Sequence, residues 1–292
     1  MSESEAKKGS ILVDEDKCVS CGICIAICPH DALSFENGFP VTTGKCKVCG
    51  LCAASCITKA ITMKALKFRD EGIIEQYDGE KVAVFACRRL AKEGCISVMC
   101  SARIDIELIL DAFEKGASGV IVAGCEDCRN ETGSREAEIK VETIKKLLRE
   151  ADIEEERVRF VFGDYEKVID DFTAEIDSLG EIKGDIALLK RAARDRVLRS
   201  LVAKMRSLME DGNVYGEKIP ASKLEKLIEE AASFAVKSSR ILNVLGDGAE
   251  IKEIAKKAEM DEREVVETIL EMRRRGVINF EVREDLICCP GV

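Results

Sequence analysis

Cysteine is the residue whose number and spacing stand out in this chain of 292 residues. Fifteen cysteines fall into three groups, at residues 18–56, 87–128 and 288–289, while His30 is the single histidine. In a reducing compartment so many thiols are more typical of metal ligands or redox groups than of disulfides. One histidine nearly excludes a histidine-based metal site or a histidine-dependent catalytic triad.

The first group repeats one motif. The pattern C-x2-C-x2-C-x3-C runs over residues 18–28 and again over residues 46–56. A four-iron cube takes three thiolates from one tight loop, and its fourth comes from the other run. We therefore expect one 4Fe-4S cluster to bind Cys18, Cys21, Cys24 and Cys56, and another to bind Cys46, Cys49, Cys52 and Cys28. The alternative, structural zinc, fits poorly because zinc sites usually pair two cysteines with a distant second pair.

Small residues repeat with the cysteines. They occupy equivalent places in the two runs: Gly22, Gly50, Ala32 and Ala60. We expect the glycines to allow the loops to bend closely around a cluster. With these motifs, residues 11–64 resemble bacterial-type two-cluster ferredoxins, with Ile57 standing where the first run has Pro29. For His30, which follows that proline, we expect a turn or capping role.

The second region alternates apolar strands with amphipathic helices. Strands are predicted at residues 81–86, 96–99, 119–123 and 157–162, and helices at residues 104–115 and 135–151. Such alternation implies right-handed crossovers and a parallel sheet, as in a flavodoxin-like fold.

Thiols follow three of these strands. Cys87, Cys100 and Cys125 lie at the carboxyl ends of successive strands, and Cys128 lies one helical turn past Cys125. Because sites in open parallel sheets form at this edge, we expect the four thiols to converge and to suit an iron–sulfur cluster or zinc. A thioredoxin-like dithiol at residues 125–128 and plain core cysteines are the alternatives. Cys95 precedes its strand, so we expect a buried structural thiol at the opposite end.

A family resemblance adds to this interpretation. Within residues 81–180, the chain resembles the delta subunit of methyl-viologen-reducing hydrogenase, most clearly at Val98–Arg103, Ala112–Cys125, Glu155–Arg159 and Asp171–Ile176. The resemblance implies a 2Fe-2S cluster, and electron transfer to the flavin-bearing A subunit of heterodisulfide reductase. Carried over by position, its ligands are Cys87, Cys100, Cys125 and Cys128. The family usually has further cysteines around the first of these, where this chain has Ala86, Arg88, Arg89 and Leu90.

The ferredoxin part, with its trailing residues 61–76, resembles the ferredoxin module at the end of that same flavin-bearing protein. The chain therefore looks like a fusion of this module with a delta subunit. The fusion implies an iron–sulfur electron-transfer subunit between a hydrogenase- or dehydrogenase-type partner and a flavoprotein like heterodisulfide reductase A. No residue has the features of a substrate acid, base or nucleophile, so we do not predict that the chain alone is an enzyme. A stand-alone reductase using the third site is the alternative.

Helices dominate the remainder. Two apolar stripes are predicted to pack together and on the α/β region, one at Ile186, Leu189, Ala193, Val197, Leu201 and Leu208, the other at Leu224, Leu227, Ile228, Ala231 and Ala235. Helices at residues 250–258 and 262–275, followed by a wing over residues 277–288, suggest a winged helix. Such a module often binds DNA, which leaves a redox-sensing transcription regulator as an alternative function. The second helix begins Asp261-Glu-Arg-Glu, which favours protein docking. Cys288 and Cys289 are expected to be exposed thiols.

The fold class expected is a multi-domain α+β protein: a ferredoxin domain at residues 1–78, a flavodoxin-like α/β iron–sulfur domain at residues 79–180, and a helical, winged-helix-like region at residues 181–292. A further break is possible near Arg240. The net charge of −10 disfavours nucleic-acid binding. No apolar run is long enough for a membrane span, and the polar N-terminus lacks a secretory signal, so we expect a cytoplasmic protein. The electron donor, terminal acceptor, direction of flow and stoichiometry are not encoded in these patterns.

Overall fold

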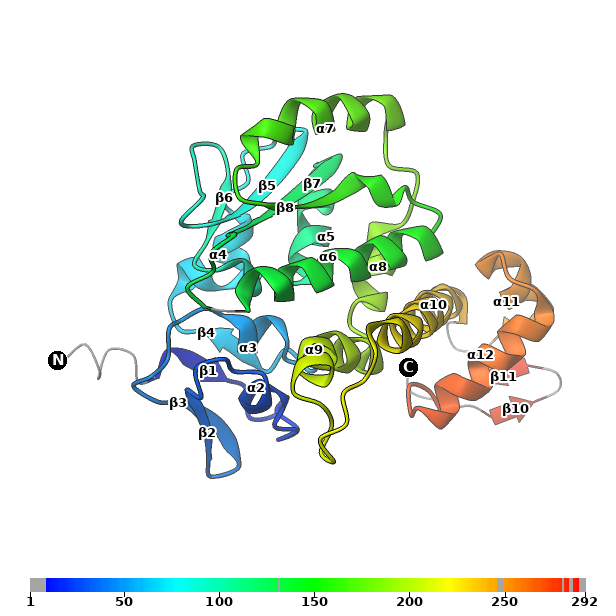
Figure 1. Ribbon diagram of the computed structural model, residues 1–292. Coiled ribbons are helices and arrows are strands. Elements are labelled where there is room, and N and C mark those ends of the chain that lie inside the picture. The colour runs from blue at the N-terminus through cyan, green and yellow to red at the C-terminus, as the bar shows by residue number, and fades with distance from the viewer. Residues whose placement is uncertain (1–8, 131, 246–248, 280, 284–285, 289–292) are drawn as a thin grey trace.

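The computed structural model describes residues 9–130, 132–245, 249–279, 281–283 and 286–288 (Figure 1). Its first part consists of short elements around the first cysteine group. They are β1 (Ile11–Val13), α2 (Ile23–Ala26), β2 (Leu33–Glu36), β3 (Phe39–Thr42), α3 (Leu51–Ala54) and β4 (Ile61–Met63). β1 pairs antiparallel with β4, and β2 pairs antiparallel with β3. In sequence, β1 precedes the first cysteine run, β2 and β3 lie between the two runs, and β4 follows the second run.

The internal repeat extends to the backbone. Gly22 and Gly50 precede α2 and α3 with φ angles of 74° and 81°, in the left-handed region that favours glycine, as the sequence predicted. Two further pairs at equivalent places also have positive φ: Ser20 with Val48, and Asp31 with Lys59. For a β-branched residue such as Val48 this conformation costs about 1–3 kcal/mol. The loop geometry is therefore imposed by more than its glycines.

The second part is a four-stranded sheet with helices on both faces. Its elements are η1 (Leu66–Phe68), α4 (Asp70–Ile74), β5 (Val82–Cys87), β6 (Ile96–Val98), η2 (Ser101–Arg103), α5 (Ile106–Glu114), β7 (Gly119–Gly124), α6 (Gly133–Glu150), η3 (Glu155–Arg157), β8 (Val158–Phe162) and α7 (Glu166–Leu179). The strands run parallel in the order β6-β5-β7-β8, which confirms the predicted strands and parallel sheet. Figure 1 shows α7 on one face, with α5 and α6 on the other.

Three more helices pack on the side of the sheet covered by α5 and α6. They are α8 (Ile186–Ala192), α9 (Arg196–Glu210) and α10 (Ala221–Leu245). Their buried side chains, such as Leu189 and Val202, belong to the same hydrophobic core as α5 and α6, so the predicted packing on the α/β region is confirmed. The predicted first stripe is wrong in its middle, because the chain starts a new helix after Asp195. Val197 is 41% exposed, and its neighbour Leu198 is buried instead.

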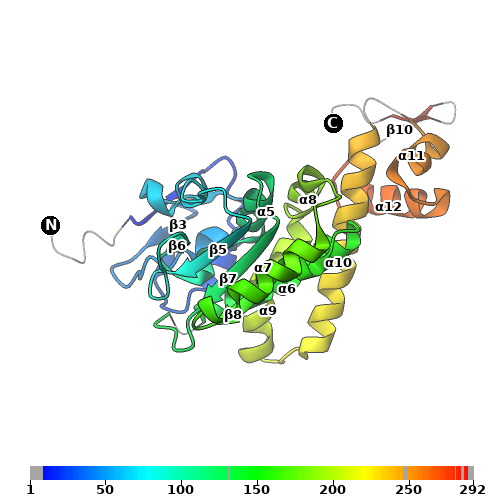
Figure 2. The same cartoon turned by 90° about the horizontal axis from the view of Figure 1, so that it is seen from above.

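The C-terminal part has its own core, which begins at Ile241, next to the possible break near Arg240. Its elements are β9 (Ala249–Glu250), α11 (Ile251–Ala258), α12 (Glu262–Arg274), β10 (Glu281–Arg283) and β11 (Leu286–Cys288). β11 lies between β9 and β10 in an antiparallel sheet, so the predicted helix pair and hairpin are present. Figures 1 and 2 place α10 between this part and the α/β layer. Cys289 lies outside the described residues.

Candidate iron–sulfur sites

The first predicted set of thiols surrounds one cavity. Its lining includes Cys18, Cys21, Cys24 and Cys56, together with Gly22 and Phe35. Three thiols therefore come from the first run and the fourth from the second. Burial, together with the nearby thiols of Cys56 and Cys21, raises the pKa of Cys24 to about 12. Four soft ligands around a cavity fit an iron–sulfur cube, which must displace the thiol protons when it binds.

The second predicted set also comes together across the two runs. Burial, together with the nearby thiols of Cys28 and Cys46, raises the pKa of Cys49 to about 11. Burial likewise raises the pKa of Cys52 well above its ordinary value, and the thiols of Cys49, Cys46 and Cys28 contribute to that rise. Backbone amides already point at two of the sulfurs: Val48 N donates to Cys46 Sγ at 3.4 Å, and Ala32 N donates to Cys28 Sγ at 3.5 Å. Such bonds are one means by which proteins tune cluster potentials.

The third set converges at the carboxyl edge of the parallel sheet. Gly133, in the first turn of α6, shows this best: a Cβ atom there would lie 2.4 Å from Cys100 Sγ and 2.9 Å from Cys128 Sγ. Burial, together with the adjacent thiols of Cys87 and Cys128, raises the pKa of Cys125 to about 12. Because Cys128 lies near both Cys100 and Cys125, and Cys125 also lies near Cys87, the residues 125–128 pair is part of a larger group. The missing side chain at Gly133 leaves the space that a cluster needs.

A cation and hydrogen-bond donors border this third set. Arg89 donates to the backbone oxygen of Asp127 and lies close enough to Cys125 to oppose the rise in its pKa. Burial raises the pKa of Cys100 to about 12, and hydrogen bonds from the Ala102 backbone and the Asn130 side chain oppose that rise. Within the part of the chain that the structure describes, no three Cys, His, Asp or Glu side chains are close enough to hold a single metal ion.

The placement predicted for Cys95 is wrong. β6 is short, and its first residue, Ile96, already pairs with Phe85 near the carboxyl end of β5. Cys95 therefore lies beside the sheet rather than at its opposite end. It is half-buried and packs with Tyr165 on the face covered by α7, away from the third set.

We expect Cys95→Ser to retain the third cluster and Cys125→Ser to lose it, because only the second thiol belongs to the converging set. The measurement is electron paramagnetic resonance of the reduced full chain, prepared anaerobically. Loss of the third signal in Cys95→Ser, with retention in Cys125→Ser, would contradict this arrangement.

The second and third sets are neighbours. Cys49, Cys100 and Cys128 pack in one small apolar cluster whose other members are Ile23, Ile27, Leu51 and Ala102. The thiol of Cys49 also contributes to the raised pKa of Cys100. His30 adds a polar link, since its Nε2 donates to Asn130 Oδ1 at 3.1 Å. His30 thus bonds to a residue a hundred positions away, where the sequence suggested only a turn or cap.

Comparison with known proteins fits this geometry. Residues 82–180 match the family model described as methyl-viologen-reducing hydrogenase, delta subunit, and residues 11–34 match the 4Fe-4S binding domain model. The D iron-sulfur subunit of the F420-non-reducing hydrogenase of Archaeoglobus profundus is 38% identical over 96 residues, which cover 30% of this chain and 70% of that protein. The chain belongs to the hydrogenase delta subunit family. The delta-subunit domain follows a 4Fe-4S ferredoxin domain, so the predicted fusion is confirmed.

A second relative matches a longer stretch of the chain. The A subunit of the ferredoxin:CoB-CoM heterodisulfide reductase of Methanosarcina mazei is 31% identical over 218 residues, which cover 63% of this chain and 27% of that protein. A ferredoxin of Pyrobaculum islandicum is 50% identical over 34 residues, 11% of this chain and 32% of that protein. The chain spans about a quarter of the length of the heterodisulfide reductase subunits that it matches. It is an iron–sulfur electron-transfer subunit related to these proteins.

Buried charges join the ferredoxin domain to the delta-subunit domain. Arg199 of α9 donates to the backbone oxygen of Cys56 at 2.8 Å and of Ala54 at 3.2 Å, and it pairs with Glu107 at 3.3 Å. Lys59 of the ferredoxin domain pairs with Asp105 at 2.6 Å. Burial alone would raise the pKa of Asp105, but the nearby cations hold it below its ordinary value. These pairs fix the carbonyl group of a proposed cluster ligand against the delta-subunit domain.

Lys140 is a further buried cation at this junction. Its Nζ donates to Ala102 O at 2.8 Å, and burial lowers its pKa to about 8. The charge lies close enough to Cys49 to oppose the rise in the pKa of that thiol. The sequence pattern did not single out Lys140, because a lysine on an amphipathic helix is usually solvated.

We expect Arg199→Met to destabilise the chain by about 3 kcal/mol, because removing one partner leaves Glu107 buried with less compensation and two carbonyl oxygens without their donor. Methionine keeps most of the side-chain volume. The measurement is the urea unfolding midpoint of the cluster-loaded chain. Arg196→Met, on the exposed side of the same helix, is the control and should shift stability by less than about 0.5 kcal/mol. Equal effects in the two variants would show that the buried pair does not hold the domains together.

Proposed function

We propose that this chain relays electrons between a partner of the hydrogenase or dehydrogenase type and a flavoprotein resembling the A subunit of heterodisulfide reductase, within a cytoplasmic complex. In this proposal the ferredoxin domain holds two 4Fe-4S clusters and the delta-subunit domain holds a 2Fe-2S cluster on Cys87, Cys100, Cys125 and Cys128. The proposed domains are residues 1–78, 79–180 and 181–292. Among the described residues, no helix is both long and apolar enough to cross a membrane.

The observation that carries the proposal is the contact between the second and third thiol sets. Clusters bound there would exchange single electrons. Cys49 comes from the ferredoxin domain and Cys100 from the delta-subunit domain, yet they pack in one apolar cluster. Leu51 and Ala102 exclude water from this junction, each being at most 2% exposed. The chain's own packing, rather than diffusion, therefore holds the two redox sites together.

The first and third thiol sets, which lie at the two ends of the proposed electron path, differ in the exposed side chains that surround them. The cavity of the first thiol set is bordered by Val19 and Phe35, which are 54% and 46% exposed, and Cys21 is exposed as well. Exposed apolar side chains around a redox site suit contact with a partner protein. At the other end, Arg88 and Arg89 are exposed beside the third set. We propose that one redox partner docks at each end, with the direction of electron flow set by the partners.

The C-terminal part, in this proposal, is a winged-helix-like module that docks to protein. Its α12 begins with Asp261 as N-cap and carries Glu262 and Glu264 in its first turn. Carboxylates at this position would lie against the base edges of polyanionic DNA if the helix entered the major groove, so the charge pattern opposes a DNA-binding regulator.

Anaerobic purification from the native host tests the proposal. We expect the chain to elute in a complex that contains flavin, with about ten irons per chain, eight from two cubes and two from a 2Fe-2S cluster. Elution alone near 32.1 kDa, without flavin at native salt, would overturn the assignment to a complex. Bound zinc in place of iron would overturn the cofactor assignment.

A further inference from the structure

Four arginines surround a cavity between the α8–α9 turn, α10 and the end of α12. The cavity has a volume of about 370 Å³. The arginines that line it are Arg191, Arg194, Arg196 and Arg275. Asp195 is the single carboxylate in the lining, and its side chain is already engaged as the N-cap of α9. In a chain whose net charge is −10, this is a local concentration of positive charge.

Two of the four arginines are paired with carboxylates, and the other two, Arg191 and Arg196, have no carboxylate partner among the described residues. Arg194 pairs with Glu107 at 2.9 Å, and Arg275 pairs with Glu271 at 2.7 Å. Arg191, by contrast, donates among the described residues only to the neutral side chain of Asn243, at 2.6 Å. The side chain of Arg196 has no hydrogen-bond or ion-pair partner among the described residues.

The rest of the lining is apolar, with one buried hydroxyl. Phe234 and Leu242 of α10 and Val277 form this part, and the Arg275 guanidinium lies 3.8 Å from the centre of the Phe234 ring. Ser238 also lines the cavity, and its buried hydroxyl has no hydrogen-bond partner among the described residues. Buried polar groups normally have a partner, so a lone hydroxyl at a cavity wall is consistent with a missing ligand.

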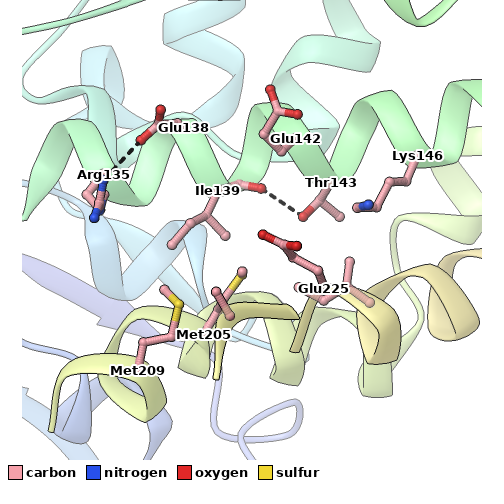
Figure 3. Close-up of a pocket in the computed structure, with 11 residues that line it drawn as sticks. Arg135, Glu138, Ile139, Glu142, Thr143, Lys146, Met205, Met209 and Glu225 are labelled. Carbon is pink, nitrogen blue, oxygen red and sulfur yellow. Dashed lines mark hydrogen bonds and ion pairs between the residues drawn. The ribbon is translucent and has the colours of Figure 1, made fainter. Parts of the chain in front are cut away.

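A larger hollow in the same layer provides a contrast. It lies between α6, α9 and α10, and Figure 3 shows its mixed lining. Two cations, Arg135 and Lys146, face three carboxylates there, on Glu138, Glu142 and Glu225. Arg135 pairs with Glu138 at 3.8 Å, and Lys146 pairs with Glu229 at 2.6 Å. Charges of both signs balance in this hollow, so it has no preference for an anion.

We propose that the arginine-lined cavity binds a small phosphate-bearing organic molecule of the nucleotide type. Guanidinium groups bind phosphate oxygens through paired, charge-assisted hydrogen bonds. The cavity volume lies in the range typical of small-molecule sites, and its apolar wall suits the non-phosphate part of such a ligand. Arg191 and Arg196 belong to the helical layer, whereas Arg275 follows α12 of the C-terminal module. A bound ligand therefore bridges the module to the rest of the chain.

Calorimetric titration of the cluster-loaded full chain with ADP and with pyrophosphate tests this site. We expect saturable binding of both, with ADP the tighter because it also contacts the apolar wall. Arg191→Gln/Arg196→Gln should weaken binding about tenfold or more, since it removes two charge-assisted hydrogen bonds. The control, Arg135→Gln/Lys146→Gln, removes two cations from the charge-balanced hollow and should leave affinity unchanged.

Hydrogen exchange provides a second readout. ADP should slow amide exchange in residues 234–243 and 275–279 of the parent chain and not in Arg191→Gln/Arg196→Gln. Absence of saturable binding by ADP and pyrophosphate would overturn the proposal. So would equal weakening by the control, or binding of citrate or of an acidic peptide without binding of either phosphate compound.

Discussion

Gly133→Ala should abolish cluster binding by the third thiol set and leave the rest of the chain folded. Alanine in a helix is normally favoured over glycine by about 1 kcal/mol, so helix propensity alone predicts a small stabilisation. The added Cβ would, however, lie 2.4 Å from Cys100 Sγ and 2.9 Å from Cys128 Sγ. A free thiol can turn away from the methyl group, but a sulfur that is fixed by iron cannot. The expected result is a folded chain without its third cluster.

The measurement combines iron content with electron paramagnetic resonance of the reduced chain. Gly133→Ala should lose about two irons and the 2Fe-2S signal, and keep the signals of the ferredoxin domain. Arg135→Ala leaves an alanine in the same turn of α6, at a position where the side chain is exposed and no thiol is crowded, and serves as the control. A normal third signal in Gly133→Ala would mean that the cluster does not occupy the space beside this residue.

The sequence was sufficient to predict most of the local features of the sites. The repeated spacing predicted which cysteines share a cluster, and the structure places thiols of the two runs near one another. Gly22 and Gly50 were predictable because only glycine adopts their conformation without strain. The positive φ angles of Ser20 and Val48 were not predictable, because neither side chain favours that conformation. Their strain is imposed by the loop and is visible only when the loop is built.

Contacts between distant segments were beyond sequence reasoning. The packing of Cys49 beside Cys100 depends on how two separately patterned domains dock, and no periodicity encodes that. The same holds for Arg199 and Lys140, which appear in the sequence as ordinary charges on amphipathic helices. Val98–Arg103 was singled out by resemblance, but the contacts of its arginine are tertiary: Arg103 donates to Phe68 O at 3.0 Å, and its Cδ would lie 2.4 Å from a Cβ at Gly50.

Errors arose where a short connection changed the register. The stripe through Val197 assumed one continuous helix, but Asp195 caps a new helix, and the buried face moves by one residue. Cys95 was assigned to the far end of the sheet because it precedes the strand that follows it. The strand has three residues, so the residue before it lies near the same edge. Strand lengths and helix breaks remain the least predictable features of such patterns.

Cys49→Ser should remove one ferredoxin cluster and also stop electron delivery between the two ends of the chain. The thiol has two relationships that no other cysteine of the ferredoxin domain combines. It shares a ligand set with Cys28, Cys46 and Cys52, and it packs beside Cys100. Serine supplies a poor ligand for iron, and it places a hydroxyl in an apolar cluster. The first thiol set and the third set are untouched, so their signals should persist.

The experiment reduces the loaded chain with a two-cluster ferredoxin and follows the 2Fe-2S signal by rapid freeze-quench resonance spectroscopy. In the parent chain the signal should appear during the reaction; in Cys49→Ser it should stay at the detection limit, although dithionite still generates it. Cys95→Ser is the matched control, because it removes a thiol of the delta-subunit domain that lies outside every set. Persistence of both 4Fe-4S signals in Cys49→Ser would refute the ligand assignment. Loss of one of them with unchanged delivery would show instead that electrons enter the delta-subunit domain directly, at the exposed edge beside Arg88 and Arg89.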